Sequence, residues 1–234
     1  MRVRQSDRWR NRVEKNRYNI NDFFQPDLRE GRYGMPKLAP TDFVPENLFP
    51  YDEKSKYKKP ENGTIHFFID DMEFENVWLR APRYPHVPAV IQKAGSAITP
   101  DFSLYSDWPL AVQVWQTYRT RLLGCLWQSQ GIQVIPSVSW STKISYSFCF
   151  DGIPEDSVVA IAVMELGSAS AKKLFVQGFH EMMKRCRPTT VLVYGEGLRL
   201  IVSELAERYD TVVFKRYPSR RTTVKINEKS EQKR

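Results

Sequence analysis

The chain has 234 residues, of which 41% are apolar and 26% are charged, and this is the composition of a globular protein. These proportions exclude collagen-like, coiled-coil and wholly disordered chains. No stretch approaches the roughly 18 apolar residues of a membrane helix, and charged residues follow Met1, so we expect neither a membrane segment nor a secretory signal. The cysteines are too widely spaced for a disulfide framework, and we expect reduced thiols in a cytoplasmic protein. They are Cys125, Cys149 and Cys186.

The net charge of +8 is concentrated at the two ends of the chain. Residues 1–59 contain 14 Lys and Arg against 9 Asp and Glu, and residues 215–234 contain 8 against 2. The region between them has 13 basic and 16 acidic residues and is slightly negative. Because affinity for a polyanion grows with the number of phosphates neutralised, this distribution favours nucleic-acid binding through two basic arms.

The N-terminal arm combines arginines with aromatic residues, a mixture that suits single-stranded or irregular nucleic acid. One alternative is a segment that docks on its own domain through Trp9 and Val13, four residues apart, and another is a solubilising tail. The C-terminal arm is basic in the same way. The residues expected to contact phosphates are Arg4, Arg8, Arg10, Arg12, Lys215, Arg216, Arg220 and Arg221.

Residues 26–60 hold six of the fifteen prolines and predict an extended segment that wraps the domain, without helices or strands. Six short β-branched or aliphatic runs follow, as is typical of strands buried on both faces. They are Thr64–Ile69, Ser96–Thr99, Gln133–Val138, Val158–Met164, Thr189–Tyr194 and Thr211–Phe214. His66, inside the first run, is expected to be a core residue.

Three helices are predicted between these runs. The first begins near Pro109, because proline suits the first helical turn, and ends at Gly131. The second follows Gly167, and the third covers roughly Leu198–Tyr209. Their apolar residues recur at helical spacing and are expected to face the core.

Alternating strands and helices predict an α/β fold with a mainly parallel sheet of about six strands and flanking helices. We expect an incomplete or distorted TIM-like barrel, because polar residues end nearly every strand, with an open doubly wound sheet as the alternative. The predicted organisation is a basic, Pro-rich N-terminal arm (1–60), a single α/β domain (61–214) and a basic C-terminal tail (215–234).

Acidic residues follow four of the predicted strands, and parallel strands would bring them to one edge of the sheet. Asp70, Asp101 and Glu165 are candidate ligands of a divalent cation, Mg²⁺ or Mn²⁺. Glu196 is the candidate catalytic base, and Asp101 and Ser139 are further catalytic candidates. A pair of these carboxylates would also serve metal-free glycoside hydrolysis. The structural alternative is that they cap the helices that follow.

The segment 167–173, between the fourth strand and its helix, offers free N–H groups, hydroxyls and lysines to a phosphate. Its spacing is not that of a Walker loop. The candidate contacts are Ser168, Ser170 and Lys172. Gly195–Gly197 begins like a dinucleotide fingerprint, but Leu200 stands in place of the third glycine, so we expect no nicotinamide cofactor.

Several uncommon blocks of sequence resemble one known family. They are Pro100–Tyr105, Tyr118–Arg119, Trp127–Ile132, Val134–Pro136, Ser139–Trp140 and Phe150–Pro154. Over residues 63–214 the chain resembles the family known as domain of unknown function 4417, which occurs in bacteria, phages and other mobile elements. The resemblance implies one compact α/β domain in a prophage or mobile-element setting, and it assigns no catalytic residues.

Aromatic residues lie close in sequence to Asp101 and Ser139. Tyr105, Trp108 and Trp140 either form a stacking wall or close the end of the core.

Three functional hypotheses follow from the sequence. The first is a nucleic-acid-associated protein of phage or mobile-element origin that acts as a metal-dependent hydrolase. The second is a non-catalytic adaptor that binds nucleic acid or protein, and the third is a glycosidase-like hydrolase that uses paired carboxylates.

Overall fold

Seven parallel strands form the centre of the part of the chain that the structure describes. The computed structural model describes residues 20–22, 24–56, 59–81, 86–163 and 168–219. The parallel strands are β3 (Leu48–Pro50), β4 (Thr64–His66), β5 (Ser96–Ile98), β6 (Gln133–Ile135), β7 (Val158–Ala162), β8 (Thr190–Tyr194) and β9 (Val213–Tyr217). A short antiparallel pair, β1 (Arg29–Glu30) and β2 (Met35–Pro36), precedes them. The prediction of a mainly parallel α/β fold is confirmed.

The strands form two sheets, in the orders β3-β4-β5-β6 and β7-β8-β9, and backbone hydrogen bonds connect the two. The N–H of Val138 donates to Ala160 at 2.8 Å, and the N–H of Ala160 donates to Pro136 at 2.9 Å. The spatial order therefore follows the chain, as in a barrel, without the reversal of a doubly wound sheet. Within the described residues β9 does not pair with β3, so the sheet stays open at that edge.

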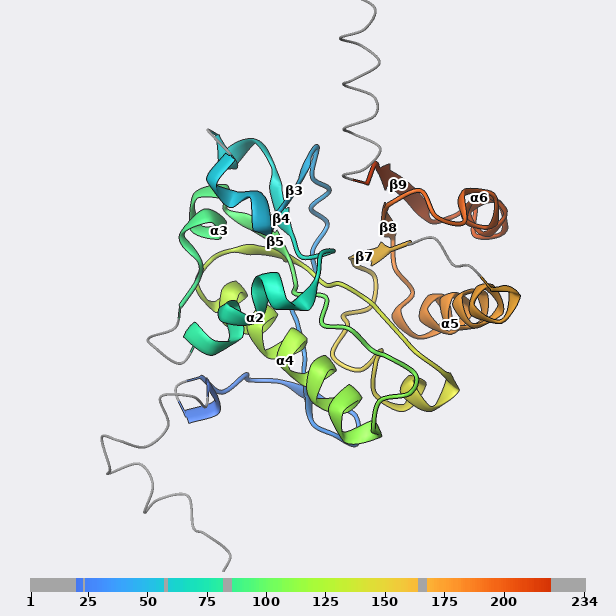
Figure 1. Cartoon of the computed structure of the whole chain (residues 1–234), viewed down its shortest axis with the longest axis horizontal. Helices are drawn as coiled ribbons and strands as arrows, with labels where there is room; N and C mark the ends of the chain where they lie inside the picture. Colours follow the sequence, from blue (N-terminus) through green and yellow to red (C-terminus); the bar gives the residue numbers. More distant parts are fainter. Residues whose placement is uncertain (1–19, 23, 57–58, 82–85, 164–167, 220–234) are drawn as a thin grey trace, which may run out of the picture.

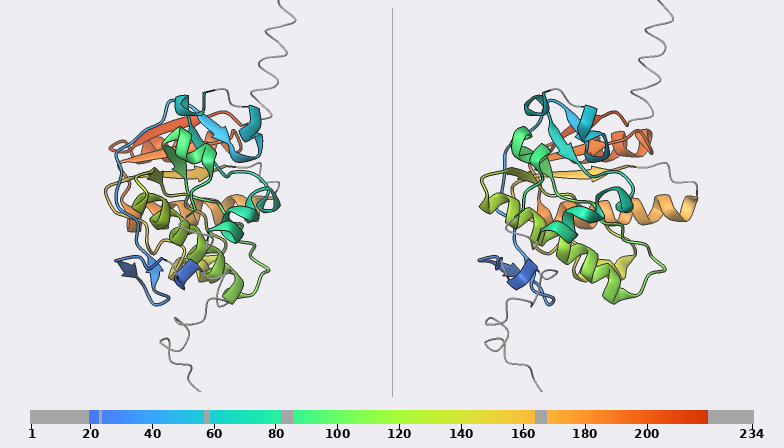
Figure 2. Two further views of the ribbon diagram at one scale, coloured as in Figure 1. Left: turned by 90° about the vertical axis from the view of Figure 1, so that its left-hand side faces the viewer. Right: turned by 60° about the vertical axis from the view of Figure 1, so that its left-hand side comes forward.

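Helices cover the outside of the curved sheet, with α2, α3 and α4 on one side and α5 and α6 on the other (Figure 1). They are α2 (Asp71–Arg80), α3 (Ala89–Ala94), α4 (Leu110–Ser129), α5 (Ala169–Cys186) and α6 (Arg199–Arg208). Short 3-10 helices are η1 (Ile20–Asp22), η2 (Tyr51–Lys56), η3 (Pro60–Asn62) and η4 (Lys143–Ser147). In both views of Figure 2 the long helix α4 runs beneath the strands. None of the described helices combines the length and the apolar content that crossing a bilayer requires.

Successive side chains of the central strands β7 and β8 point into two different hydrophobic clusters. Val159 and Ile161 of β7 belong to the outer cluster beneath α5 and α6. Ala160, between them, belongs to an inner cluster with Leu192 of β8 and Ile98 of β5. This alternation has the period of two that a strand imposes, and it explains why the sequence of β7 is apolar throughout.

The expected burial of His66 and of the cysteines is confirmed, but His66 was also expected to be fully hydrogen-bonded, and its Nε2 has no hydrogen-bond partner among the described residues. The side chain of His66 is fully buried, its Nδ1 accepts a hydrogen bond from the Phe68 N–H at 3.2 Å, and its ring centroid lies 4.4 Å from that of Tyr194. Burial lowers the pKa of His66 to about 3, so its ring is neutral within the sheet. All three cysteines are buried and free of disulfides.

The fold departs from the sequence prediction at both edges of the sheet. Strand β3 forms inside the proline-rich segment expected to lack strands, because Pro50 lies on an edge strand, where a missing N–H is tolerated. Strand β9 continues past residue 214 to Tyr217. Lys215, expected in the basic tail, donates from Nζ to the Pro45 carbonyl, as does the Tyr217 hydroxyl. These bonds connect the last strand to the residues that precede β3.

Helices also differ from their predicted pattern. The predicted start of α4 at Pro109 is confirmed, and Gly131 lies just beyond its end with a φ of 80°. However, Trp115 of α4 is 44% exposed, although it was expected to face the core. Helices α2 and α3 were not predicted; each is short and buries only a few apolar side chains.

A buried arginine connects α4 to the loops beyond β6. Arg121 is only 2% exposed, and its guanidinium donates to three backbone carbonyls: to Ser137 at 3.1 Å, to Cys149 at 2.8 Å and to Asp151 at 3.2 Å. A buried guanidinium is stable only when its N–H groups are paired, and these carbonyls would otherwise be unpaired as well. The three bonds therefore fix the chain between residues 137 and 151 against α4.

Replacing Arg121 by Met is expected to lower the free energy of unfolding by about 3 kcal/mol, because three buried carbonyls lose their donors. Chemical denaturation monitored by circular dichroism measures the change. The matched control is Arg208→Met, since Arg208 is exposed at the end of α6, and we expect a change within about 0.5 kcal/mol there. Equal effects of the two substitutions would contradict the structural role of Arg121.

Candidate functional site

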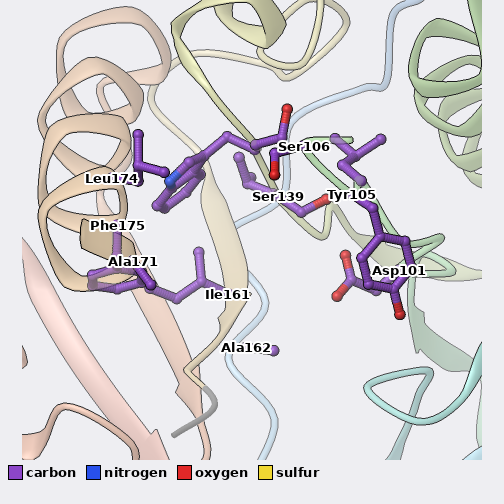
Figure 3. A pocket seen from close by; sticks show the side chains of 13 residues that line it. Asp101, Tyr105, Ser106, Ser139, Ile161, Ala162, Ala171, Leu174 and Phe175 are labelled. Atoms are coloured by element: carbon purple, nitrogen blue, oxygen red, sulfur yellow. The ribbon is translucent and has the colours of Figure 1, made fainter. Parts of the chain in front are cut away.

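A cavity opens at the carboxyl ends of β5, β6 and β7, and the first turns of α5 close one side of it; we call it the carboxyl-edge pocket. Its volume is about 460 Å³, within the usual range of ligand pockets. Figure 3 shows Asp101 and Tyr105 on one side and Ala171, Leu174 and Phe175 of α5 on the other. The remaining lining residues are Leu104, Ser106, Val138, Ser139, Trp140, Ser141, Ile161 and Ala162.

Hydrogen bonds between the ends of β5 and β6 bring Asp101 close to Ser139. The N–H of Ser137 donates to Thr99 Oγ1 at 2.7 Å, and the Ser137 hydroxyl donates to the Pro100 carbonyl at 3.2 Å. Because the two parallel strands are in register, Asp101 and Ser139 then follow them into the same cavity. The prediction that these two residues meet at the carboxyl edge agrees with this geometry.

Asp101 has the properties of a proton-exchanging group. Burial is the main cause that raises the pKa of its carboxyl to about 7, and the nearby Asp71 carboxylate adds to the rise. A hydrogen bond with Ser139 and the positive charge of Arg121 act in the opposite direction. Near pH 7 Asp101 therefore exists in both its neutral and its ionised form.

Asp71, the first residue of α2, is the second acid near the pocket. Its carboxylate accepts hydrogen bonds from the Ser103 N–H at 3.1 Å, the Ser103 hydroxyl at 3.0 Å and the Gln116 amide at 3.5 Å. The pKa of Asp71 is raised overall, because burial outweighs the Ser103 hydrogen bonds and the charge of Arg119, which lower it. These donors favour the charged form of Asp71, and the Asp71 carboxylate in turn adds to the rise in the pKa of Asp101.

Aromatic rings lie on both sides of the pocket. Trp140 lines it, with its ring centroid 5.6 Å from that of Phe175. Tyr105 lines the other side, is 53% exposed and packs edge-to-face against Trp108 at 4.7 Å. Of the three predicted stacking residues, Tyr105 and Trp140 therefore reach the pocket, and Trp108 supports Tyr105 without lining it.

The other predicted acids do not line this pocket. Asp70 is exposed at the N-cap of α2, and Glu196 is exposed after β8. Glu165 lies outside the described residues. Among the residues that the structure describes, no three His, Cys, Asp or Glu side chains are grouped as a metal site requires. The acids that the described chain does bring together are Asp71 and Asp101.

The predicted phosphate contacts lie at the start of α5, next to the pocket. Ser168 is the N-cap residue: its hydroxyl accepts a hydrogen bond from the Ala171 N–H at 3.1 Å and lies 3.0 Å from the Ser170 hydroxyl. The Ser168 oxygen is therefore used to cap the helix. Lys172 is exposed on the first turn.

The basic positions of the two arms fall into two groups. Lys215 and Arg216 belong to β9, where Arg216 is exposed and donates to the Ser203 hydroxyl at 3.0 Å. The other predicted contacts lie outside the described residues. They are Arg4, Arg8, Arg10, Arg12, Arg220 and Arg221.

Sequence reasoning missed the polar residues that position the pocket. Gln113 of α4 donates from Nε2 to the Trp108 carbonyl at 2.8 Å and accepts from the Ser141 hydroxyl at 2.6 Å, so it joins the loop after β5 to the loop after β6. Arg121 fixes the same region from one side, as described above. Polar residues on the buried face of an otherwise apolar helix are the signal that identifies such positions.

These features define an open parallel α/β protein whose pocket lies at the carboxyl edge of its sheet. The sequence profile of the family described as a domain of unknown function (DUF4417) matches residues 28–215, and the chain belongs to this family. The resemblance found in the sequence is confirmed and extends further toward the N-terminus.

Two phage proteins are close in sequence to this chain. Over 167 residues, 70% of the chain, it is 44% identical to the Gene 1 protein of Mycobacterium phage D29 and 41% identical to the Gene 1 protein of Mycobacterium phage L5. The aligned region covers 60% of the D29 protein and 72% of the L5 protein. No solved structure matches the chain.

The substitution Asp101→Asn tests the electrostatics of the pocket. With a pKa raised from 3.8 to about 7, the folded state keeps a proton that the unfolded chain releases, so this group's contribution to stability falls as the pH rises from about 4 to 7. Asparagine has no such charge. We expect Tm of the variant to exceed that of the wild type by about 5 °C at pH 8, with a smaller difference at pH 5.

Differential scanning calorimetry at the two pH values measures this effect. Asp70→Asn controls for the loss of one carboxylate, because Asp70 is exposed and does not line the pocket. The assignment fails if Asp101→Asn changes Tm by the same amount at pH 5 and pH 8.

Proposed function

We propose that this protein binds single-stranded nucleic acid, with one unstacked base in the carboxyl-edge pocket and basic residues on the phosphates. The observation that carries the proposal is the composition of the pocket. Tyr105 and Trp140 supply surfaces on which a base can stack, and Asp101 and Ser139 supply hydrogen-bonding groups for its edge. Bases of a duplex are already stacked and paired, so this pocket favours single strands.

Basic residues near the pocket and in the two arms support the phosphate contacts. Lys172 is exposed one residue after Ala171, which lines the pocket, and Arg216 is exposed on β9. The N-terminal arm adds arginines such as Arg8 and Arg12. Phosphate contacts supply affinity that salt weakens, while base stacking supplies affinity that tolerates many sequences.

Hydrolysis is a second candidate function, and the pair of Asp71 and Asp101 favours it. One carboxyl with a pKa of about 7 beside a hydrogen-bonded carboxylate gives a general acid and an ionised partner. In this form the reaction needs no metal and is lost in Asp101→Asn. The Mg²⁺- or Mn²⁺-dependent form predicted from the sequence uses Asp70, Asp101 and Glu165 as ligands, and chelation would abolish its turnover.

Binding to oligonucleotides tests the proposed function. We expect the full chain to bind single-stranded 15-mers of DNA or RNA more tightly than a 15-bp duplex in about 50 mM salt, with affinity falling steeply as salt increases. Fluorescence anisotropy with labelled oligonucleotides measures both properties. Absence of binding to DNA and RNA single strands at low salt would contradict the proposal.

Two sets of variants separate the phosphate contacts from the base contact. Tyr105→Ala is expected to weaken binding about tenfold without changing the salt dependence, because it removes one stacking surface. Trp115→Ala is the matched control, since Trp115 is a partly exposed aromatic residue of α4 that does not line the pocket. Replacing four arginines of the N-terminal arm by Gln should instead reduce the salt dependence. They are Arg4, Arg8, Arg10 and Arg12.

A further inference from the structure

One stripe of α5 faces the carboxyl-edge pocket and the tryptophan that lines it. Ala171, Leu174 and Phe175 line the cavity at helical spacing, and Gly178 continues the same stripe one turn later. Gly178 is buried, and the indole of Trp140 lies directly against its Cα. The wall of the pocket therefore consists of a helix face with a tryptophan packed on its smallest residue.

Glycine is required at this position because there is no room for a Cβ atom, and not because of the backbone conformation. A Cβ atom at residue 178 would lie 2.1 Å from Trp140 Nε1, 2.2 Å from Cδ1 and 2.5 Å from Cε2, far inside contact distance. Gly178 lies within the regular helix α5 and has no positive φ. Alanine is a better helix former than glycine, so the helix itself gains nothing from Gly178.

We propose that Gly178 is a positioning residue that holds the Trp140 indole back against α5 and so keeps the carboxyl-edge pocket open for a flat aromatic ring. That this bound ring is a nucleic-acid base rests on the proposed function. Phe150 and Phe175 flank the indole, with centroids 6.1 Å and 5.6 Å from it. A side chain at position 178 therefore displaces the indole toward the open cavity. The displaced indole then occupies the space that the ligand would take.

The substitution Gly178→Ala in the full chain tests this role. With 5-fluorotryptophan incorporated, the chain gives one ¹⁹F resonance for each of its six tryptophans, and the loss of a resonance in Trp140→Phe assigns Trp140. We expect Gly178→Ala to shift the Trp140 resonance and to weaken binding of a labelled thymidine 15-mer about tenfold. Gln177→Ala, one position earlier on α5 and not in the pocket lining, is the matched control and should change neither quantity.

The double variant Gly178→Ala/Trp140→Phe separates a steric role from a general loss of structure. Because phenylalanine is smaller than tryptophan, the double variant should bind the 15-mer more tightly than Gly178→Ala alone. If Gly178→Ala does not fold, the double variant should recover the folded state. An unshifted Trp140 resonance, or a double variant no better than the single one, would overturn the proposal.

Failure of this inference and failure of the proposed function give different results. If the wild type binds no oligonucleotide, the proposed function is wrong, and the ¹⁹F shift and the recovery of Tm in the double variant still decide the role of Gly178. If the wild type binds but Gly178→Ala binds equally well with an unchanged ¹⁹F spectrum, only the role of Gly178 is wrong.

Discussion

The site depends on the hydrogen bonds of the buried Arg121 guanidinium. Placing that charge inside the protein costs free energy, which is offset by hydrogen bonds from all three of its nitrogens to backbone carbonyls at separate positions of the chain. One of them, that of Ser137, lies at the end of β6, two residues before Ser139. The charge that stabilises the loops thus also fixes the strand end from which the pocket begins, and it lies close enough to lower the pKa of Asp101.

The pocket gains its chemistry from an asymmetry between two acids. Asp71 accepts three hydrogen bonds from Ser103 and Gln116, while Asp101 lies in a more apolar cavity with Ser139 as its hydrogen-bonding partner. Neighbouring carboxylates repel each other, so the Asp71 carboxylate adds to the effect of burial in raising the pKa of Asp101. A neutral carboxylic acid offers a donor and an acceptor together, which suits the edge of a base and also proton transfer.

The sequence predicted the sheet better than the site. The six apolar runs identified six strands because most of their residues are buried, although β9 is partly exposed, and β3 was hidden by Pro50 on the sheet edge. Asp101 lines the pocket, as expected of an acid that directly follows a strand, and its catalytic and metal-binding roles stay predictions. The sequence analysis selected Asp70 in place of its neighbour Asp71. At the start of a helix, neighbouring residues point in different directions, and local sequence does not show which of the two carboxylates points inward. The role of Gly178 depends on Trp140, 38 positions away, and no periodic pattern contains that contact.

The central claim is that a base of a single strand enters the pocket between Tyr105 and Trp140. Photo-crosslinking tests it most directly: a single-stranded oligonucleotide with one 5-iodouracil is irradiated with the full chain, and the modified peptides are identified by mass spectrometry. We expect crosslinks to Tyr105 or Trp140, and fewer of them in Gly178→Ala. Efficient crosslinking confined to the basic arms, with neither aromatic residue modified, would contradict it.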